Sequence, residues 1–466
     1  MTSSAKNDNR YTNEMARFVS QLTFEKIPGE VIERIKLLIL DSLGCGIYGI
    51  SLEWSQILTK TLSQLDSSNF CGILGSSMRT SAPHAALANG TLIQSFELDD
   101  VHRVGIMHVG AVTLPPILAL AELRPGITGR DFLTAAVAGY EVGPRVGICM
   151  GQEHIGQGWH QGATIGVFSA ASGAASALRL PQNLTVHALG IAGTQSAGLM
   201  AAQYGSMVKR MHAGRSAQSG LYGALLAENG FTGITDVFES EYGGFCTTFS
   251  RSSDRFRLAE LTSGLGERFE TMMISLKFYS CVGSNHTTLD ALREIRSRRP
   301  FRVEEVEQIV VHASQVTFDH VGWKYSPEGI TSAQLNMPFC VATLLLEGDV
   351  FVDQFSEAML TNPARLELAN RVKVVADPDI TAKGAKFRHL VRVEVILKDG
   401  TILEQTVEAP RGSEKSFATE AAVAEKFQKL ARHNLPQSQV DAICEMVLNL
   451  ESLPDANALV RMLAKK

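Results

Sequence analysis

The chain has 466 residues, of which 45% are hydrophobic and 20% are charged. It can therefore form two or three domains and bury a large core without disulfide bonds or structural metals. Its 43 Lys and Arg against 48 Asp and Glu give a net charge of −5, which argues against nucleic-acid binding, because that requires a basic surface. The seven cysteines form no CxxC pair, and the sequence shows no signal segment and no run of about 18 apolar residues. We therefore expect free thiols, a cytoplasmic location and no membrane or nucleic-acid partner.

The first half of the chain has a helical pattern. One helical stripe is formed by Ile32, Ile35, Ile39 and Leu43. Residues 83–96 and 110–123 are almost continuously apolar, which predicts buried helices. Thr128 and Asp131 precede another apolar run and predict a capped, buried helix. The Ala, Gly and Ser residues of 166–180 predict a close contact between helices.

The pattern changes after about residue 265. Strands are predicted at the β-branched segments 306–312, 371–375, 389–397 and 401–407. Asp399-Gly400 predicts a hairpin turn between the last two strands, and residues 332–346 predict a helix. Helical patterning returns over 415–466. The predicted fold is mainly α: a large helical domain of residues 1–265 plus 410–466, with a smaller α/β (α+β) lid domain of 266–409 inserted into it.

Gly44-Cys-Gly46-Ile-Tyr-Gly49 matches the dinucleotide-binding pattern GxGxxG. That motif requires a preceding strand and a βαβ unit, whereas the preceding segment here is helical. We therefore interpret the glycines as the end of a helix.

Three blocks combine ionisable residues with glycines in a way that packing alone does not require. The first is Glu97-Leu-Asp-Asp-Val-His-Arg-Val-Gly-Ile-Met-His108. It contains Glu97, Asp99, Asp100, Arg103 and His108 as candidate functional side chains. The alternative for a single residue is a helix end at which Asp99 or Asp100 bonds to the backbone.

The second block is Gly156-Gln-Gly-Trp-His160-Gln-Gly. It predicts a helix N-terminus that faces a pocket and favours an anion; the alternative is a core tryptophan beside a satisfied histidine. The third block contains Lys209-Arg-Met-His212 within apolar flanks. A buried lysine is costly unless it is paired or its pKa falls enough for it to act as a base.

A fourth, weaker block is Lys277-Phe-Tyr-Ser-Cys-Val-Gly-Ser-Asn-His286, near the predicted domain boundary. Arg145, within a predicted apolar helix, is a further candidate. It would either pair with a carboxylate such as Glu141 or bind a substrate carboxylate as a fork.

The blocks contain no metal-ligand spacing and no phosphate loop. They supply Lys, Arg, His and carboxylates, which favours cofactor-free proton transfer beside a carboxylate of a polyanionic substrate. Such a site must neutralise the carboxylate and place a base within hydrogen-bond reach of a carbon-bound proton.

Four stretches occur in a fixed order: ELDDVH with His108, GWHQG, GSMVKRMHAG and LKFYSCVGSNH. In these stretches, and over almost its whole length, the sequence resembles the 2-methylcitrate dehydratase (MmgE/PrpD) family. The resemblance implies a helical domain with a smaller α/β domain, a homodimer, no redox cofactor and small polycarboxylate substrates. Family activities include methylcitrate dehydration, cis-aconitate decarboxylation and iminodisuccinate epimerisation. Local details are similar to the decarboxylases and the epimerase, and the length and N-terminal region are most similar to the epimerase.

The resemblance places His108, His160 and Lys209 at substrate-facing positions, and we expect them to be the catalytic residues. Expected to bind substrate are Glu97, Asp99, Asp100, Arg103, Arg145, His212, Lys277 and His286. Some family decarboxylases carry a histidine five residues after the lysine of the fourth block, where this chain has Val282. The expected activity is therefore epimerisation of iminodisuccinate by proton removal and return, with cis-aconitate decarboxylation or dehydration as alternatives.

Overall fold

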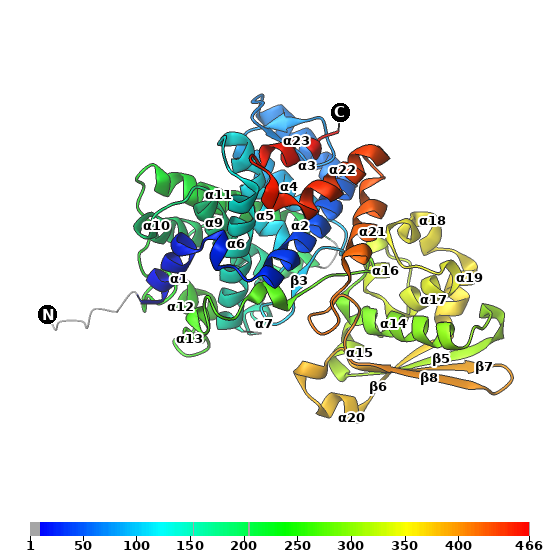
Figure 1. The fold of residues 1–466 in the computed structure, drawn as a ribbon. Helices are drawn as coiled ribbons and strands as arrows, with labels where there is room; N and C mark the ends of the chain where they lie inside the picture. Colours follow the sequence, from blue (N-terminus) through cyan, green and yellow to red (C-terminus); the bar gives the residue numbers. More distant parts are fainter. Residues whose placement is uncertain (1–9, 152, 204–205, 466) are drawn as a thin grey trace. The chain divides into compact units, whose positions relative to one another are not determined.

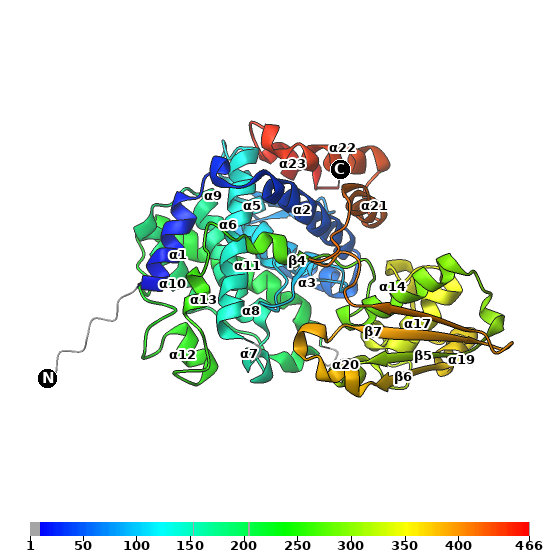
Figure 2. The same cartoon turned by 60° about the horizontal axis from the view of Figure 1, so that its bottom comes forward.

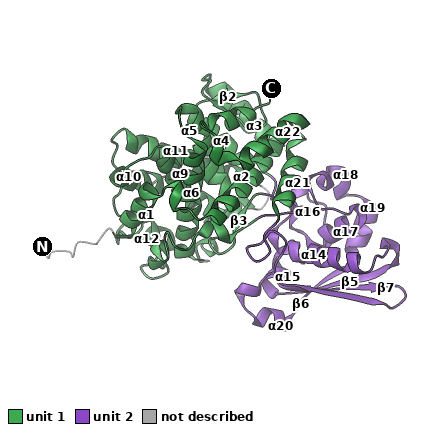
Figure 3. Ribbon diagram, in the orientation of Figure 1, with its two compact units in different colours: residues 1–95, 99–275, 419–466 green, residues 96–98, 276–418 purple. Residues whose placement is uncertain are grey.

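The computed structural model describes residues 10–151, 153–203 and 206–465. The chain divides into two compact units (Figure 3). Unit 1 comprises residues 1–95, 99–275 and 419–466, and unit 2 comprises residues 96–98 and 276–418. The boundaries at 276 and 418 lie later in the chain than the predicted boundaries at 266 and 409. The first lies later because β4, which ends at Ser275, pairs with β3 of unit 1.

Unit 1 is an assembly of helices with four strands of two residues each in its described part (Figures 1 and 2). Its longer helices are α1 (Arg10–Gln21), α2 (Gly29–Gly49), α3 (Glu53–Leu65), α4 (Ala82–Ile93), α5 (Gly110–Leu123), α6 (Gly129–Met150), α9 (Gly166–Ala177), α10 (Gln182–Gly193), α11 (Val208–Glu228), α21 (Glu420–Ala431) and α22 (Gln437–Leu448). Its shorter helices are α7 (Glu153–Gly156), α8 (Gln161–Thr164), α12 (Phe245–Ser250), α13 (Ala259–Thr262) and α23 (Asn457–Met462). Its strands are β1 (Cys71–Gly72), β2 (Arg79–Thr80), β3 (Val101–His102) and β4 (Ile274–Ser275).

The buried helices predicted in the first half of the chain are confirmed. α5 is buried along nearly its whole length, as its unbroken apolar sequence requires. α6 begins with a capping box, in which Thr128 accepts from the Asp131 N–H and the Asp131 carboxylate accepts from the Thr128 N–H. The small residues of α9 allow the predicted close contact: a Cβ added at Gly220 of α11 would lie 2.3 Å from Cβ of Ala170.

The GxGxxG segment forms the C-terminal end of α2, whose last residue is Gly49, so the interpretation of its glycines as the end of a helix is confirmed. The helix continues to Gly49 because the glycines let neighbouring segments approach its surface. A Cβ added at Gly46 would lie 2.4 Å from Leu74, and one added at Gly49 would lie 2.2 Å from the Leu92 carbonyl oxygen. Close packing, not a ligand, accounts for these glycines.

Unit 2 contains a four-stranded sheet in the order β6-β5-β7-β8. β5 (Val306–Ala313) pairs in parallel with β6 (Val372–Ala376) and antiparallel with β7 (Val391–Leu397), and β7 forms a hairpin with β8 (Ile402–Val407). All four predicted strands are confirmed. The chain is therefore mainly α with one small α/β part, as predicted.

Helices α14 (Gly283–Arg298) and α17 (Met337–Glu347) pack together and against strands of this sheet. The unit also contains α15 (Gln315–Val321), α16 (Ile330–Leu335), α18 (Glu357–Leu360), α19 (Pro363–Asn370) and α20 (Pro378–Ala382). The prediction of a single helix over 332–346 is wrong in detail, because this segment forms parts of two helices, α16 and α17. The segment breaks at Asn336, whose side chain caps α17, and Pro338 occupies the first turn of the new helix.

All seven cysteines are buried free thiols, as expected. Within the described ranges no single helix is long and apolar enough to cross a membrane, and α2 with α3 meets that test only as a pair bent by 80°.

Candidate functional site

The first block forms the loop between α4 and α5, and Asp100 caps α5 from within it. One Asp100 oxygen accepts from the N–H groups of Val109 and Gly110, both at 3.0 Å, and the other accepts from the Tyr140 hydroxyl at 2.6 Å. Burial raises the pKa of Asp100, although the Tyr140 bond opposes the rise. The predicted substrate-binding role of Asp100 is therefore replaced by a structural one, because both carboxylate oxygens are engaged within the fold.

His108 is oriented by the same loop. Its Nδ1 lies 2.9 Å from the Asp100 carbonyl oxygen and 3.0 Å from Oδ2 of Asp99. Both neighbours are oxygen acceptors, so Nδ1 carries a proton and the neutral ring has its lone pair on Nε2. The side chain is 19% exposed, whereas that of Asp99 is buried. Asp99 therefore orients the ring, and Nε2 of His108 is available for proton transfer.

His160 and His212 form a direct pair, with their Nδ1 atoms 3.1 Å apart. One Nδ1 must donate and the other must accept, so the two rings share one proton along this bond. In the neutral pair, one ring then has a lone pair on Nε2 and the other an Nε2–H. Burial, and secondarily the nearby Lys209 charge, lowers the pKa of His212. The geometry brings together a proton acceptor and a proton donor.

His160 is held in place from both sides. Its N–H donates to the Gly198 carbonyl at 3.2 Å, and its carbonyl accepts from the Thr164 hydroxyl at 3.3 Å. Thr164 Oγ1 in turn lies 2.7 Å from Nε2 of His154, a residue that the sequence did not single out. Burial lowers the pKa of His154 to about 4, so this ring is neutral at physiological pH. The predicted helix start in this block is the short α8, with His160 at its N-cap position.

The first turn of α11 is strongly basic. Lys209 is half-buried, and Arg210 is buried with its guanidinium 5.7 Å from the Trp54 ring centroid. The positive end of the helix dipole adds to these charges. Positive groups at a helix N-terminus favour a negatively charged neighbour.

Three helices meet where these residues lie. A Cβ added at Gly90 of α4 would lie 2.7 Å from Cα of Gly214 on α11 and 2.8 Å from the Ala111 carbonyl of α5. His212 precedes Gly214 by half a turn, and His108 immediately precedes α5. The tertiary packing thus brings together backbone segments, those that follow His108 and His212, that are about a hundred residues apart in the chain.

Gln94, at the C-cap of α4, was missed by the sequence analysis. Its buried Oε1 has no hydrogen-bond partner among the described groups. A Cβ added at Gly162 would lie 3.8 Å from the Gln94 amide nitrogen and 3.3 Å from the His160 ring, so the Gln94 amide lies beside that ring. Its position directly before the first block was the available signal.

Unit 2 contains Glu97 of the first block and both predicted residues of the fourth block, Lys277 and His286. Glu97 and Lys277 form an ion pair at 3.2 Å, with the lysine side chain 8% exposed. Glu97 has a φ of 58°, a strained conformation of the kind that clusters at functional sites.

His286 has a different environment, since its Nε2 lies 3.1 Å from the Cys281 carbonyl and its ring packs edge-on against Tyr279. These contacts are structural, so the predicted substrate contact of His286 is not supported. Val282 is the N-cap residue of α14.

Arg145 is fully buried on α6 and also corrects the prediction. Its guanidinium donates to the carbonyls of Ser263 and Arg268, both at 2.7 Å, and Glu141 lies 3.7 Å away. Of the two alternatives, the pairing of Arg145 with Glu141 inside the fold is the one observed, because the Arg145 guanidinium is not exposed to solvent. Arg103 is half-buried in the turn after β3.

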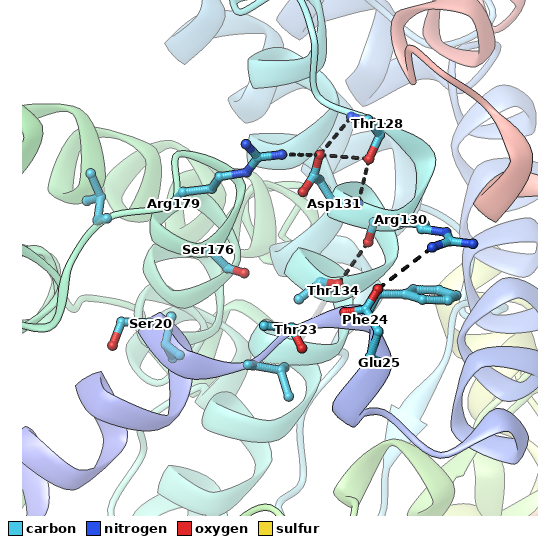
Figure 4. Close-up of a pocket in the computed structure, with 13 residues that line it drawn as sticks. Ser20, Thr23, Phe24, Glu25, Thr128, Arg130, Asp131, Thr134, Ser176 and Arg179 are labelled. Carbon is cyan, nitrogen blue, oxygen red and sulfur yellow. Dashed lines mark hydrogen bonds and ion pairs between the residues drawn. The ribbon is translucent and has the colours of Figure 1, made fainter.

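A separate surface cavity of about 370 Å³ lies between the α1 end and the start of α6 (Figure 4). Its charged groups pair with one another: Arg179 with Asp131 at 2.7 Å, and Arg130 with Glu25 at 3.7 Å. None of the predicted site residues lines it. In residues 10–151, 153–203 and 206–465, no three His, Cys, Asp or Glu side chains are grouped as metal ligands.

Comparison with known proteins identifies the family of the chain. The MmgE/PrpD N-terminal domain matches residues 13–257, and the MmgE/PrpD C-terminal domain matches residues 279–452. A cis-aconitate decarboxylase-like protein of Aspergillus oryzae is 34% identical over 97% of both chains. The cis-aconitate decarboxylase of Aspergillus terreus is 32% identical over 97% of this chain and 95% of its own, and the human one is 26% identical over 97% and 94%. The chain therefore belongs to the MmgE/PrpD family.

Proposed function

We propose that this chain is a lyase that decarboxylates an unsaturated tricarboxylate of the cis-aconitate type. The observation that carries the proposal is the full-length similarity to cis-aconitate decarboxylases, at 34% and 32% identity. The leading prediction from sequence, epimerisation of iminodisuccinate, has no counterpart among these relatives and becomes the second candidate.

Decarboxylation breaks the bond between a carbon and its carboxylate, which leaves as carbon dioxide. The bonding electron pair remains on the carbon and is delocalised towards the neighbouring unsaturated carboxylate, and a proton must then be delivered to carbon. The site must therefore bind three negative charges, stabilise the carbanion and supply one proton.

The residues of unit 1 match these requirements. The basic first turn of α11, with Lys209 and Arg210, attracts the carboxylates. The Nε2–H of the neutral His160–His212 pair is the available proton donor, and Nε2 of His108 is a proton acceptor. We assign His108, His160 and Lys209 to catalysis, and the polar Gln94 amide beside His160 to substrate contact.

The second candidate retains one specific observation. The resemblance to the family implies that some decarboxylases carry a histidine where this chain has Val282, so a decarboxylation that needs that histidine would fail here. Epimerisation needs a proton acceptor and a proton donor at the carbon, and the His160–His212 pair supplies one of each.

The test is to incubate the purified protein with cis-aconitate in deuterium oxide and to follow carbon dioxide release and deuterium incorporation by NMR. The same protein is incubated with one iminodisuccinate stereoisomer, followed by loss of the α-proton signal and by chiral analysis. Carbon dioxide release supports the lyase, and α-proton exchange with new stereoisomers supports the epimerase. Neither reaction over a long incubation with folded protein would refute both assignments.

Lys209→Ala is expected to lower turnover by at least a hundredfold while the melting temperature stays within about 2 °C, since loss of one catalytic group removes several kcal/mol of transition-state stabilisation. Lys60→Ala, an exposed lysine of α3, is the matched control and should retain full activity. If Lys209→Ala unfolds the protein instead, Lys209 is structural.

A further inference from the structure

His108 directly follows a tight hairpin of residues 101–107, whose first arm is β3. Two backbone bonds close this hairpin. The His102 N–H donates to the Met107 carbonyl at 2.9 Å, and the Met107 N–H donates to the His102 carbonyl at 3.3 Å. The closure brings His108 back to the residues that precede the hairpin, where its Nδ1 lies 2.9 Å from the Asp100 carbonyl oxygen. The hydrogen bonds of His108 therefore depend on the shape of this hairpin.

The His102 ring lies inside the hairpin and is engaged at both nitrogens. Its Nδ1 lies 2.8 Å from the Gly105 nitrogen, and its Nε2 lies 3.1 Å from Oε2 of Glu270. A backbone N–H can only donate, so Nδ1 accepts, and the single proton of the neutral ring is on Nε2, which donates to the carboxylate. The side chain is 1% exposed, so water does not compete for either bond. His102 thus has the tautomer opposite to that of His108.

Glu270 is a fixed anchor for this ring. Arg268 donates to Oε1 of Glu270 at 2.9 and 3.1 Å, and the Glu270 N–H donates to the Glu141 carboxylate at 2.8 Å. Burial by itself would raise the pKa of Glu270, but the hydrogen bond from His102 and the nearby arginine charges outweigh it and lower the pKa. Glu270 is therefore an ionised acceptor. One nitrogen of the ring is tied to the body of unit 1, and the other holds the hairpin.

The backbone beside the Gly105 bond is strained. Ile106 has a φ of 51°, which a β-branched residue adopts only when the surrounding contacts impose it. A Cβ added at Gly105 would lie 3.0 Å from Nδ1 of His102 and 2.9 Å from the Pro144 carbonyl oxygen of α6, so the backbone is pressed against both. A hairpin released from these contacts would relax, and His108, two residues after the strained position, would move with it.

We propose that His102 is a positioning residue for His108. Its Nδ1 holds the Gly105 N–H and keeps the strained hairpin closed, so that the His108 ring retains its Nδ1 bonds and presents Nε2. The use of that Nε2 in a reaction rests on the proposed function. The effect of His102 on the tautomer of His108 does not, and it can be measured without any substrate.

Two substitutions separate the two ring nitrogens. The amide of an asparagine occupies the position of Nδ1, so His102→Asn can keep an acceptor for Gly105 but loses the donor to Glu270. The amide of a glutamine occupies the position of Nε2, so His102→Gln does the reverse. We expect His102→Asn to keep kcat within about threefold and His102→Gln to lower it about tenfold to a hundredfold, the scale on which a displacement of about 1 Å acts. KM should stay within about threefold in both, because the buried ring does not reach the substrate.

The readout that needs no substrate is long-range ¹H–¹⁵N NMR of the full-length protein labelled with ¹⁵N-histidine. The two signals are assigned from their loss in His102→Asn and His108→Gln. In the unsubstituted protein we expect a proton on Nε2 of His102 and on Nδ1 of His108. His102→Asn should leave the His108 tautomer unchanged, whereas His102→Gln should give a mixture that includes the Nε2–H form.

His84→Gln is the matched control for the loss of a histidine bound to a carboxylate. His84 lies at the start of α4, and its Nδ1 lies 2.9 Å from Oδ2 of Asp66. This variant should change neither kcat nor the tautomer of His108. Thermal unfolding of each variant ensures that only folded proteins are compared.

Equal losses of kcat in His102→Asn and His102→Gln, or a greater loss in His102→Asn, would overturn the proposal, because the pair with Glu270 would then explain His102. An unchanged His108 tautomer in His102→Gln would overturn it as well. So would a protonated Nδ1 on His102 in the unsubstituted protein, a result that requires no variant to fold. If the chain decarboxylates no tricarboxylate but the tautomers change as expected, the proposed function fails while the role of His102 stands.

Discussion

Substituting Arg145 with methionine separates its structural role from the substrate-binding role that the sequence predicted. The change removes two donors to carbonyls at 2.7 Å and a third to the Gly264 carbonyl at 3.4 Å. It also leaves Glu141 and Glu270 without the cation that lies 3.7 and 3.9 Å from them. Breaking a buried pair in this way costs about 3–5 kcal/mol.

The corresponding loss of thermal stability is substantial. With an unfolding entropy of roughly 2.1 cal/mol/K per residue, about 4 kcal/mol lowers the melting temperature of a unit of this size by about 6 °C. The Michaelis constant of the protein that remains folded should stay within about twofold of the original, because Arg145 does not reach the substrate. Thermal unfolding followed by circular dichroism, together with steady-state kinetics below the transition, measures both quantities.

Arg130→Met is the matched control on the same helix. Arg130 is 59% exposed and lies 3.7 Å from Glu25, so its loss should change the melting temperature by less than about 1 °C, since exposed pairs contribute little. Loss of a charged hydrogen bond to substrate would raise the Michaelis constant about a hundredfold. If Arg145→Met shows such a rise with an unchanged melting temperature, the structural assignment is refuted and the substrate-binding one is restored.

Three further predictions follow from buried and exposed groups of unit 1. Asp100→Ala leaves the N–H groups of Val109 and Gly110 without an acceptor and should reduce the unfolding free energy by about 3 kcal/mol or more, whereas Asp100→Asn keeps an acceptor and should lose less; equal losses in urea titrations would contradict the capping role. Burial raises the pKa of Glu141 to about 7 from 4.5, so the unfolded chain loses this proton first as the pH rises. The free energy of unfolding should therefore fall by up to about 3 kcal/mol between pH 4.5 and pH 7. Urea titrations at the two pH values should show that Glu141→Gln lacks this part of the pH dependence. The predicted homodimer would bury the exposed apolar residues Tyr222 and Leu226 of α11, which are 40% and 38% exposed. A Tyr222→Glu/Leu226→Glu protein should then sediment with half the mass of the unsubstituted one. An unchanged mass would exclude this face as the dimer interface.

Local signals predicted local structure well. The Thr128 and Asp131 pair forms the expected capping box, because both hydrogen bonds lie within four consecutive residues. Asp399-Gly400 turns the chain between β7 and β8, and Gly400 has the positive φ of 85° that favours glycine. The break at Asn336 was readable in principle, since Asn followed by Met-Pro338 is a helix start, but the apolar run across it concealed the signal.

Residue types in the candidate site were also predictable, while their roles were not. The first block contains two adjacent aspartates, and only the fold shows that Asp100 caps α5 while Asp99 supports His108. The sequence indicated His160 and His212 separately, yet their shared hydrogen bond joins residues 52 positions apart. His102, within the first block, was not singled out, because its two hydrogen bonds depend on the hairpin and on Glu270, 168 positions away in the chain.

The sequence by itself determined the class of fold, the family and the set of chemical groups, because periodicity, caps, turns and motifs depend on residues close together in the chain. Only the tertiary structure decided which ionisable groups are buried together, which carboxylates are engaged in holding the backbone and which ring nitrogens remain available. Those properties depend on burial and on contacts between distant segments, and a pKa or a tautomer is set by the groups within a few ångströms rather than by neighbours in sequence.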